Sequence, residues 1–133
     1  MLRQAHTRAA ATAAASLEPL GIGGRHFGAL MLINRDGLTT QRELIRETGS
    51  DKAGMARTIE KLAARGLIKQ TTSSSDRRVV ELTLTEEGKA TLREATRLAS
   101  ENMAPLFDGF SPDEVASLES LLARFIANAD ESF

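Results

Sequence analysis

The sequence contains no cysteine, tryptophan or tyrosine, and it has only two histidines among its 133 residues. Without cysteine the chain can form no disulfide, no thiolate metal site, no cysteine nucleophile and no thiol switch that responds to peroxide. His6 and His26 fall on different predicted helices, so we expect neither a zinc site nor a catalytic triad and interpret both as packing or surface residues. The absence of these residue patterns predicts a protein that is not an enzyme and that needs no metal and no cofactor.

Long apolar runs are also missing. No stretch approaches the roughly 18 apolar residues that a membrane-spanning helix requires. Arg3, Arg8 and Glu18 interrupt the alanine-rich start of the chain, so no signal-peptide core forms there. We therefore expect a cytoplasmic protein with no membrane partner, and the length predicts one domain rather than two.

The formal net charge of −1 gives no reason of its own to expect a nucleic-acid partner. The distribution of charge is more informative. Residues 41–93 carry 11 Lys and Arg against 8 Asp and Glu, whereas the remainder of the chain is acidic. This modest polarity supports a DNA partner for the central part of the chain without deciding it.

Periodic apolar residues predict a largely helical chain. A first helix over residues 2–17 is rich in alanine, and its stripe of small residues fits either a surface helix or a dimerisation helix. A second helix is predicted over residues 24–35, followed by a short strand at residues 38–39. The segment Thr40–Glu43 has the form of a capping box and opens a short third helix.

The centre of the chain predicts a helix-turn-helix. A turn at Thr48-Gly49-Ser50 leads into a helix with Asp51 as its N-cap and with Met55, Ile59 and Leu62 on one buried stripe. Gly54 falls at the edge of the opposite, exposed face. That exposed face carries Ala53, Arg57, Glu60, Lys61 and Ala64.

Two strands follow this helix, over residues 68–72 and 80–84, and the polar loop between them carries Asp76, Arg77 and Arg78. An exposed helix of this kind fits the major groove of duplex DNA. An arginine-tipped loop fits the narrow, electronegative minor groove.

The end of the chain predicts two more helices. Thr85-Glu-Glu-Gly88 opens a long helix that we expect to reach about Phe107. A second capping box, Ser111 to Glu114, opens a final helix. The final helix carries an apolar stripe that needs a partner, made of Val115, Leu118, Leu121, Leu122, Phe125 and Ile126.

The segments DKAGMARTIEKLAARGLIKQ and SDRRVVELTLTEEGK closely resemble the winged helix-turn-helix of the MarR family of bacterial transcriptional regulators. The resemblance implies a mainly α (α+β) fold that spans the whole chain as one MarR-type domain. Residues 20–88 would form the DNA-binding core, and residues 1–18 and 89–133 would form dimerisation helices. It also implies a homodimer on a near-palindromic DNA operator, acting as a repressor.

The same resemblance implies which residues contact DNA. The recognition helix would enter the major groove, and Asp76 would pair with and orient Arg78, which would enter the minor groove. Arg77 could do so instead, or meet a phosphate. The family commonly has Ser or Thr where this chain has Ala53, Gly54 and Ala56, so direct base contacts are expected to be fewer. The predicted DNA-binding residues are Lys52, Ala53, Gly54, Arg57, Lys61, Asp76, Arg77 and Arg78.

By resemblance, a small aromatic or apolar acid is the expected effector, held between the end helices and the second helix. Its predicted pocket is formed by Arg25, His26, Met31, Leu92 and Ala95. The alternative function is a winged-helix module whose basic face binds an acidic protein partner. The arginines at the loop tip argue against this alternative, because protein-binding winged helices have no need of them.

Overall fold

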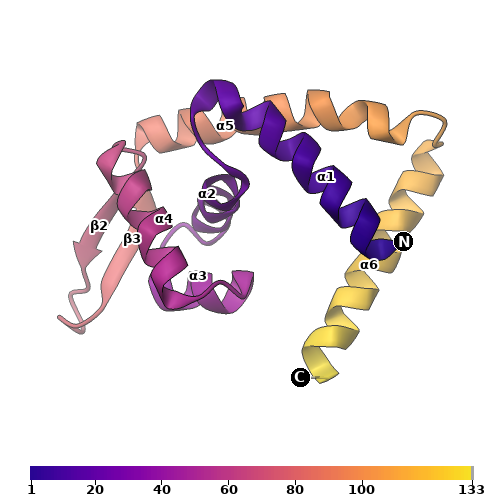
Figure 1. Cartoon of the computed structure of the whole chain (residues 1–133). Helices are drawn as coiled ribbons and strands as arrows, with labels where there is room; N and C mark the ends of the chain where they lie inside the picture. Colours follow the sequence, from indigo (N-terminus) through magenta and orange to yellow (C-terminus); the bar gives the residue numbers. More distant parts are fainter. Residues whose placement is uncertain (133) are drawn as a thin grey trace.

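The computed structural model describes residues 1–132 and shows a mainly helical chain with one three-stranded antiparallel sheet (Figure 1). The predicted fold class, a winged helix-turn-helix flanked by helices at both ends, is confirmed. The elements in chain order are α1 (Leu2–Leu17), the 3₁₀ helix η1 (Glu18–Leu20), α2 (Gly24–Asp36), β1 (Thr39–Thr40), α3 (Gln41–Thr48), α4 (Lys52–Ala64), β2 (Ile68–Thr72), β3 (Val80–Leu84), α5 (Glu86–Met103), the 3₁₀ helix η2 (Ala104–Phe107) and α6 (Pro112–Ser132).

The sheet has the strand order β1-β3-β2, so the hairpin of β2 and β3 is joined on its inner edge by the short β1. Ile68 pairs with Leu84 at the base of the hairpin, and Thr72 pairs with Val80 at its outer end. Both predicted hairpin strands are confirmed. On β3, Leu82 is buried, but Val80 is 43% exposed because it lies at the outer end of the hairpin.

The hydrophobic core lies between α2, α3, α4 and the sheet, and α1 and α5 close it from the side. The predicted buried stripe of α4 is confirmed, since Met55, Ile59 and Leu62 are all buried. Burial of a leucine or isoleucine side chain contributes about 1.5–3 kcal/mol each, so this core dominates the stability of the fold. The largest fully buried side chains are Leu17, Leu30, Ile33, Leu44, Leu62 and Leu82.

Side-chain caps fix where the helices begin. Asp51 accepts a hydrogen bond from the N–H of Gly54, and Ser111 and Glu114 exchange reciprocal bonds at the start of α6. Thr40 caps α3 by accepting from the N–H of Glu43, but the second half of that predicted capping box is absent. The Glu43 carboxylate pairs with Arg46 instead.

The helix predicted from Thr85 to about Phe107 is shorter than expected. The α-helix ends at Met103 and continues as the tighter η2. The reason is Pro105, which has no N–H to donate and whose ring crowds the carbonyl four residues earlier. The chain then turns away through Gly109 into α6.

The start of α5 lies directly on the backbone that follows α4. The Thr85 hydroxyl donates to the carbonyl of Gly66 at 2.6 Å, and the Thr85 N–H donates to the carbonyl of Leu67 at 3.1 Å. Gly88 is buried beside the same carbonyl, and a Cβ at this position would lie 1.9 Å from the Leu67 oxygen. The connection between α4 and β2 is therefore fixed to the start of α5 through backbone contacts that only glycine permits at position 88.

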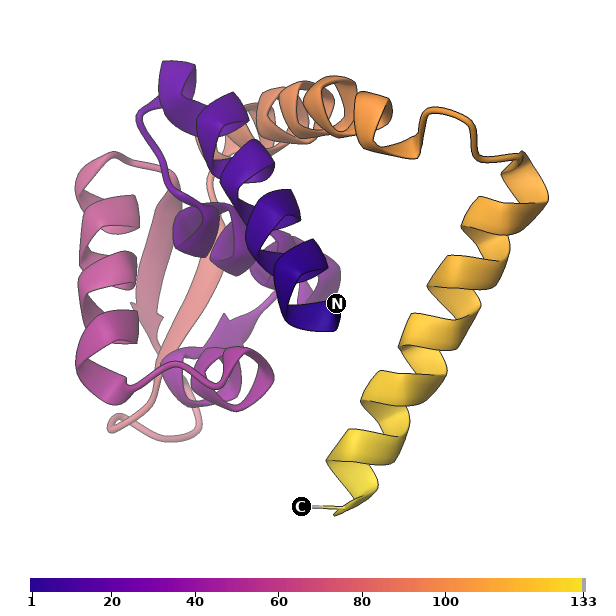
Figure 2. The ribbon, with the colours of Figure 1, turned by 45° about the vertical axis from the view of Figure 1, so that its right-hand side comes forward.

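Helix α6 stands clear of α2, α3 and α4 (Figure 2). None of its residues is buried, and Leu121, Phe125 and Ile126 are 54%, 58% and 59% exposed. Its apolar stripe is therefore present as predicted but uncovered in a single chain. None of the helices described between Met1 and Ser132 is long and apolar enough to cross a membrane.

Candidate nucleic-acid interface

The helix-turn-helix consists of α3, a three-residue turn and α4. Gly49 ends α3 with a φ of +68°, a conformation that side chains rarely adopt. The Thr48 hydroxyl bonds both to the carbonyl of Leu44 and to the hydroxyl of Ser50, which ties the turn to the end of α3. This local network fixes the direction in which the chain enters α4.

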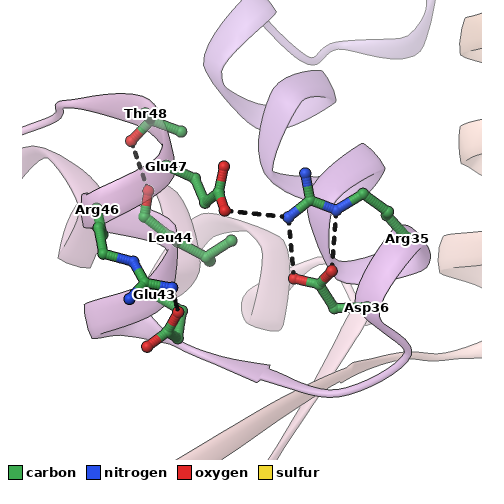
Figure 3. A network of polar contacts seen from close by, with 7 residues as sticks. All are labelled: Arg35, Asp36, Glu43, Leu44, Arg46, Glu47 and Thr48. Atoms are coloured by element: carbon green, nitrogen blue, oxygen red, sulfur yellow. Dashed lines mark hydrogen bonds and ion pairs between the residues drawn. The ribbon is translucent and has the colours of Figure 1, made fainter. Parts of the chain in front are cut away.

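A second polar network joins α2 to α3 (Figure 3). Arg35 near the end of α2 pairs with Asp36 at 2.9 Å and reaches Glu47 of α3 at 3.3 Å. The hydrogen bond between Arg35 and Asp36 raises the pKa of Arg35 and lowers the pKa of Asp36. Both side chains are exposed, so this network orients the two helices more than it stabilises them. The buried Leu44 of α3 supplies the packing.

The face of α4 that points away from the core carries small and basic side chains. Lys52, Ala53, Arg57 and Lys61 are exposed there. The small residues let the helix approach a surface closely, and the cations suit a surface of phosphates. Arg57 lies one turn from Ala53, so a single groove contact can include both.

Gly54 lies at the edge of this face and adds no exposed surface to it. It is buried, because it carries no side chain and lies between the Asp51 carboxylate and the guanidinium of Arg25 from α2. A Cβ on Gly54 would lie 2.9 Å from Asp51 Oδ1 and 3.2 Å from Arg25 Nη1.

The wing is the loop between β2 and β3, and it is internally ordered. The N–H of Ser73 donates to the carbonyl of Val79 at 2.8 Å, which closes the base of the loop. Asp76 Oδ1 accepts from the backbone N–H of Arg78 at 3.0 Å and from its Nε at 3.3 Å. The pairing expected between Asp76 and Arg78 is thus present, while the Arg78 side chain remains 90% exposed. Arg77 beside it is exposed as well.

Comparison with known proteins places this geometry in a family. The family model that matches is described as the MarR family, and it covers residues 20–79. A MarR transcriptional regulator from Methanosarcina mazei Go1 is 27% identical with a TM-score of 0.87, over 96% of this chain and 92% of that chain. A mutant MarR from E. coli in complex with operator DNA is 25% identical with a TM-score of 0.82, over 93% and 89%. Residues 20–79 match the MarR family, and the fold of the chain is that of MarR-family winged-helix regulators.

A third similar structure is that of a protein regulated by a small molecule. BpsR of Bordetella bronchiseptica, whose DNA binding is regulated by 6-hydroxynicotinic acid, is 27% identical with a TM-score of 0.81, over 93% of this chain and 89% of that chain. Members of the MarR family are DNA-binding transcriptional regulators and not enzymes. The chain is therefore a DNA-binding transcriptional regulator, as its sequence predicted.

The five residues predicted to form the effector pocket lie in different surroundings. Arg25 and His26 lie on the first turn of α2 and face α4, whereas Met31 is 49% exposed farther along α2. Leu92 and Ala95 are buried in the core. The effector pocket stays a prediction, with the first turn of α2 directed toward α4.

Two contacts near α4 were not predicted. The Arg65 guanidinium donates to the carbonyls of Leu20 and Gly21 at 2.9 and 3.0 Å, and so ties the end of α4 to η1. His26 Nδ1 accepts from the N–H of Gly23 at 3.0 Å and caps α2. Burial lowers the pKa of His26, and the nearby cations Lys61 and Arg65 lower it further. A Gln at the same helical position forms the same capping arrangement. Replacing His26 with Gln therefore removes the titrating group and keeps the cap.

We expect the stability of the fold to decline in mildly acid solution because of His26. Its pKa in the folded chain lies below the ordinary 6.5, so the unfolded chain binds more protons. Above the ordinary pKa of 6.5, the free energy of unfolding should not depend on the protonation of His26. It should fall as the pH drops from there through the folded-state pKa. Urea unfolding at a series of pH values measures this decline.

Matched variants assign that decline to one residue. His26→Gln keeps an acceptor for the Gly23 N–H and should remove this part of the pH dependence. His6→Gln, at an exposed position of α1, should leave it unchanged. A full pH dependence in His26→Gln would show that another group is responsible.

Proposed function

We propose that this regulator binds a near-palindromic operator as a homodimer and represses the genes it controls. The observation that carries the proposal is the pairing of an exposed, basic α4 with a wing whose arginine is held by Asp76. In a dimer, two such units would address half-sites about one helical turn apart, and this spacing makes the operator close to palindromic.

Helix α4 would lie in the major groove. Lys52 and Arg57 are the exposed cations near its amino end, and Ala53 and Ala56 allow the helix to lie deep in the groove. Arg57 is the side chain best suited to a guanine edge, because its guanidinium offers two parallel donors. Alanine methyls at these positions suit contacts with thymine methyl groups.

The wing would lie in the adjacent minor groove. Arg78 extends beyond the loop, and Asp76 holds its Nε, which leaves the terminal nitrogens of the guanidinium for DNA. A narrow minor groove attracts such a group because its floor is strongly electronegative. Arg77, also exposed, is placed to meet the phosphates at the rim.

The helices outside the winged-helix core would form the dimer. Residues 20–88 would bind DNA, and residues 1–18 and 89–133 would bind the second subunit; Phe133 lies outside the described residues. A small aromatic or apolar acid is proposed as the effector, since BpsR responds to 6-hydroxynicotinic acid. A ligand of this kind acts only through different affinities for the DNA-competent and incompetent states. An acidic protein partner is not favoured, because this family binds DNA.

One experiment tests the proposal directly. Fragments of the source genome that bind the purified protein should be selected and sequenced, and they should share a near-palindromic element. Addition of 6-hydroxynicotinic acid or benzoic acid then tests release. If no genomic fragment is retained at low salt, the proposed operator binding is contradicted.

Single substitutions separate the helix from the wing. Arg57→Ala and Arg78→Ala should each weaken operator binding by about 1–3 kcal/mol, through loss of a major-groove and a minor-groove contact respectively. Asp76→Ala should reproduce part of the Arg78→Ala effect, because a guanidinium without its partner is less well oriented. Fluorescence anisotropy with labelled operator measures all three affinities.

The matched control for these variants is Arg97→Ala. Arg97 lies on α5 and pairs with Glu94 and Glu101, away from α4 and the wing. The Arg97→Ala substitution removes the same charge and should change the affinity for the operator little. An Asp76→Ala variant with unchanged affinity would show that the pairing in the wing plays no part in DNA binding.

A further inference from the structure

Arg25 occupies an unusual position for a residue of α2. Its Nη1 lies 3.2 Å from the point where a Cβ of Gly54 would stand, so the guanidinium rests against the first turn of α4. A Cβ on residue 54 would force this guanidinium to shift by a few tenths of an ångström. An arginine from another helix thus lies over that turn of α4.

The guanidinium of Arg25 has unused hydrogen-bonding capacity. It carries five N–H donors, yet no hydrogen bond or ion pair of its side chain is found among residues 1–132. Asp51 lies close by, but its Oδ1 already accepts the N–H of Gly54. Arg25 is exposed, so the positive charge faces solvent beside the amino end of α4.

The charge of Arg25 lies on one particular side of α4. At about 100° per residue, Gly54 lies about 60° around the helix from Arg57, on the flank between the buried stripe and the exposed basic face. A hollow of about 410 Å³ opens there. It is lined by Arg25 and the neighbouring Gly24 and Gly28 of α2, by the turn Thr48-Gly49-Ser50, and by Met55 and Thr58 of α4.

We propose that Arg25 is a further DNA-contacting residue, and that α2 extends its guanidinium across Gly54 to a backbone phosphate at the edge of the major groove. The proposal rests on the proposed entry of α4 into that groove. Half or more of protein–DNA hydrogen bonds go to phosphate and sugar, and arginine is a frequent donor. Glycine at position 54 thus leaves room for a charged contact from the flank of α4.

The test is the salt dependence of DNA binding. Each phosphate contact contributes about 0.9 to the slope of log K against log salt concentration. Arg25→Ala should therefore lower the slope by about 0.9 and weaken binding about equally for an operator and for an unrelated duplex. The probe is a labelled duplex carrying a genomic fragment that the wild-type protein retains. Arg25→Lys should recover most of the slope, and Arg97→Ala should leave it near the wild-type value.

A double-mutant cycle tests the geometry. Gly54→Ala brings a methyl group within 3.2 Å of Arg25 Nη1 and should displace the guanidinium, so it should weaken binding in the wild-type background. In the Arg25→Ala background the same change should cost clearly less, since only the contact with Asp51 remains. Thermal unfolding of all four proteins confirms that each is folded.

The outcomes are distinguishable. If the wild type retains no duplex, the proposed function fails and this inference fails with it. If the wild type binds but Arg25→Ala binds with the same slope, Arg25 does not contact phosphate and the inference alone is overturned. A loss of affinity with an unchanged slope also overturns it, because Arg25 would then act only by positioning α4.

Discussion

Replacing Gly88 with alanine is expected to destabilise the fold by about 3 kcal/mol or more. The added Cβ would lie 1.9 Å from the carbonyl oxygen of Leu67 and 2.9 Å from its carbonyl carbon. Both are backbone atoms and cannot rotate aside. Helix α5 would have to withdraw, and this movement would lengthen the bonds from Thr85 to the carbonyls of Gly66 and Leu67.

Chemical denaturation measures the loss, and Gly28→Ala is the matched control. Gly28 is also a glycine inside a helix, but a Cβ there would meet nothing within 4 Å. Alanine at position 28 should stabilise the fold by about 0.5–1 kcal/mol, because glycine loses more freedom on folding. Equal stability of Gly88→Ala and wild type would show that α5 packs less closely on the connection between α4 and β2 than the structure indicates.

This glycine illustrates what the sequence could and could not predict. The motif Leu84-Thr85-Glu-Glu-Gly88 resembles the family, and Thr85 is a readable helix start. The contact that makes glycine necessary joins position 88 to position 67, and no local pattern connects them. Periodicity and caps act within about four residues, so helix starts and buried stripes were predicted well.

In the candidate site, too, contacts between residues close in sequence were predicted and contacts between distant residues were not. The pairing of Asp76 with Arg78 spans two residues and was predicted, whereas the bonds from Arg65 to Leu20 and Gly21 span more than forty and were not. The effector pocket stays a prediction for the same reason. Which way the first turn of α2 faces depends on how α2 packs against α4, and that packing is set by the whole core.

A charged residue on α6 is expected to have the largest effect on DNA binding without touching DNA. Helix α6 has Leu121 and Phe125 on one exposed apolar stripe and makes little contact with the rest of the described chain. An apolar cavity of about 520 Å³ continues from it between α1, η2 and α6. Large exposed apolar patches mark interaction sites, and a second copy of the same helices is the proposed cover.

Phe125→Glu should therefore give a folded monomer, whereas the wild type should sediment as a dimer at micromolar concentration. Once the two half-sites are no longer engaged together, affinity for a palindromic operator should fall by about 10²–10⁴-fold. Ser120→Glu places the same charge on the opposite face of α6 and should leave both properties unchanged. A wild-type chain that sediments as a folded monomer would contradict the proposed dimer. A Phe125→Glu monomer that binds the operator with wild-type affinity would show instead that one winged helix suffices for recognition.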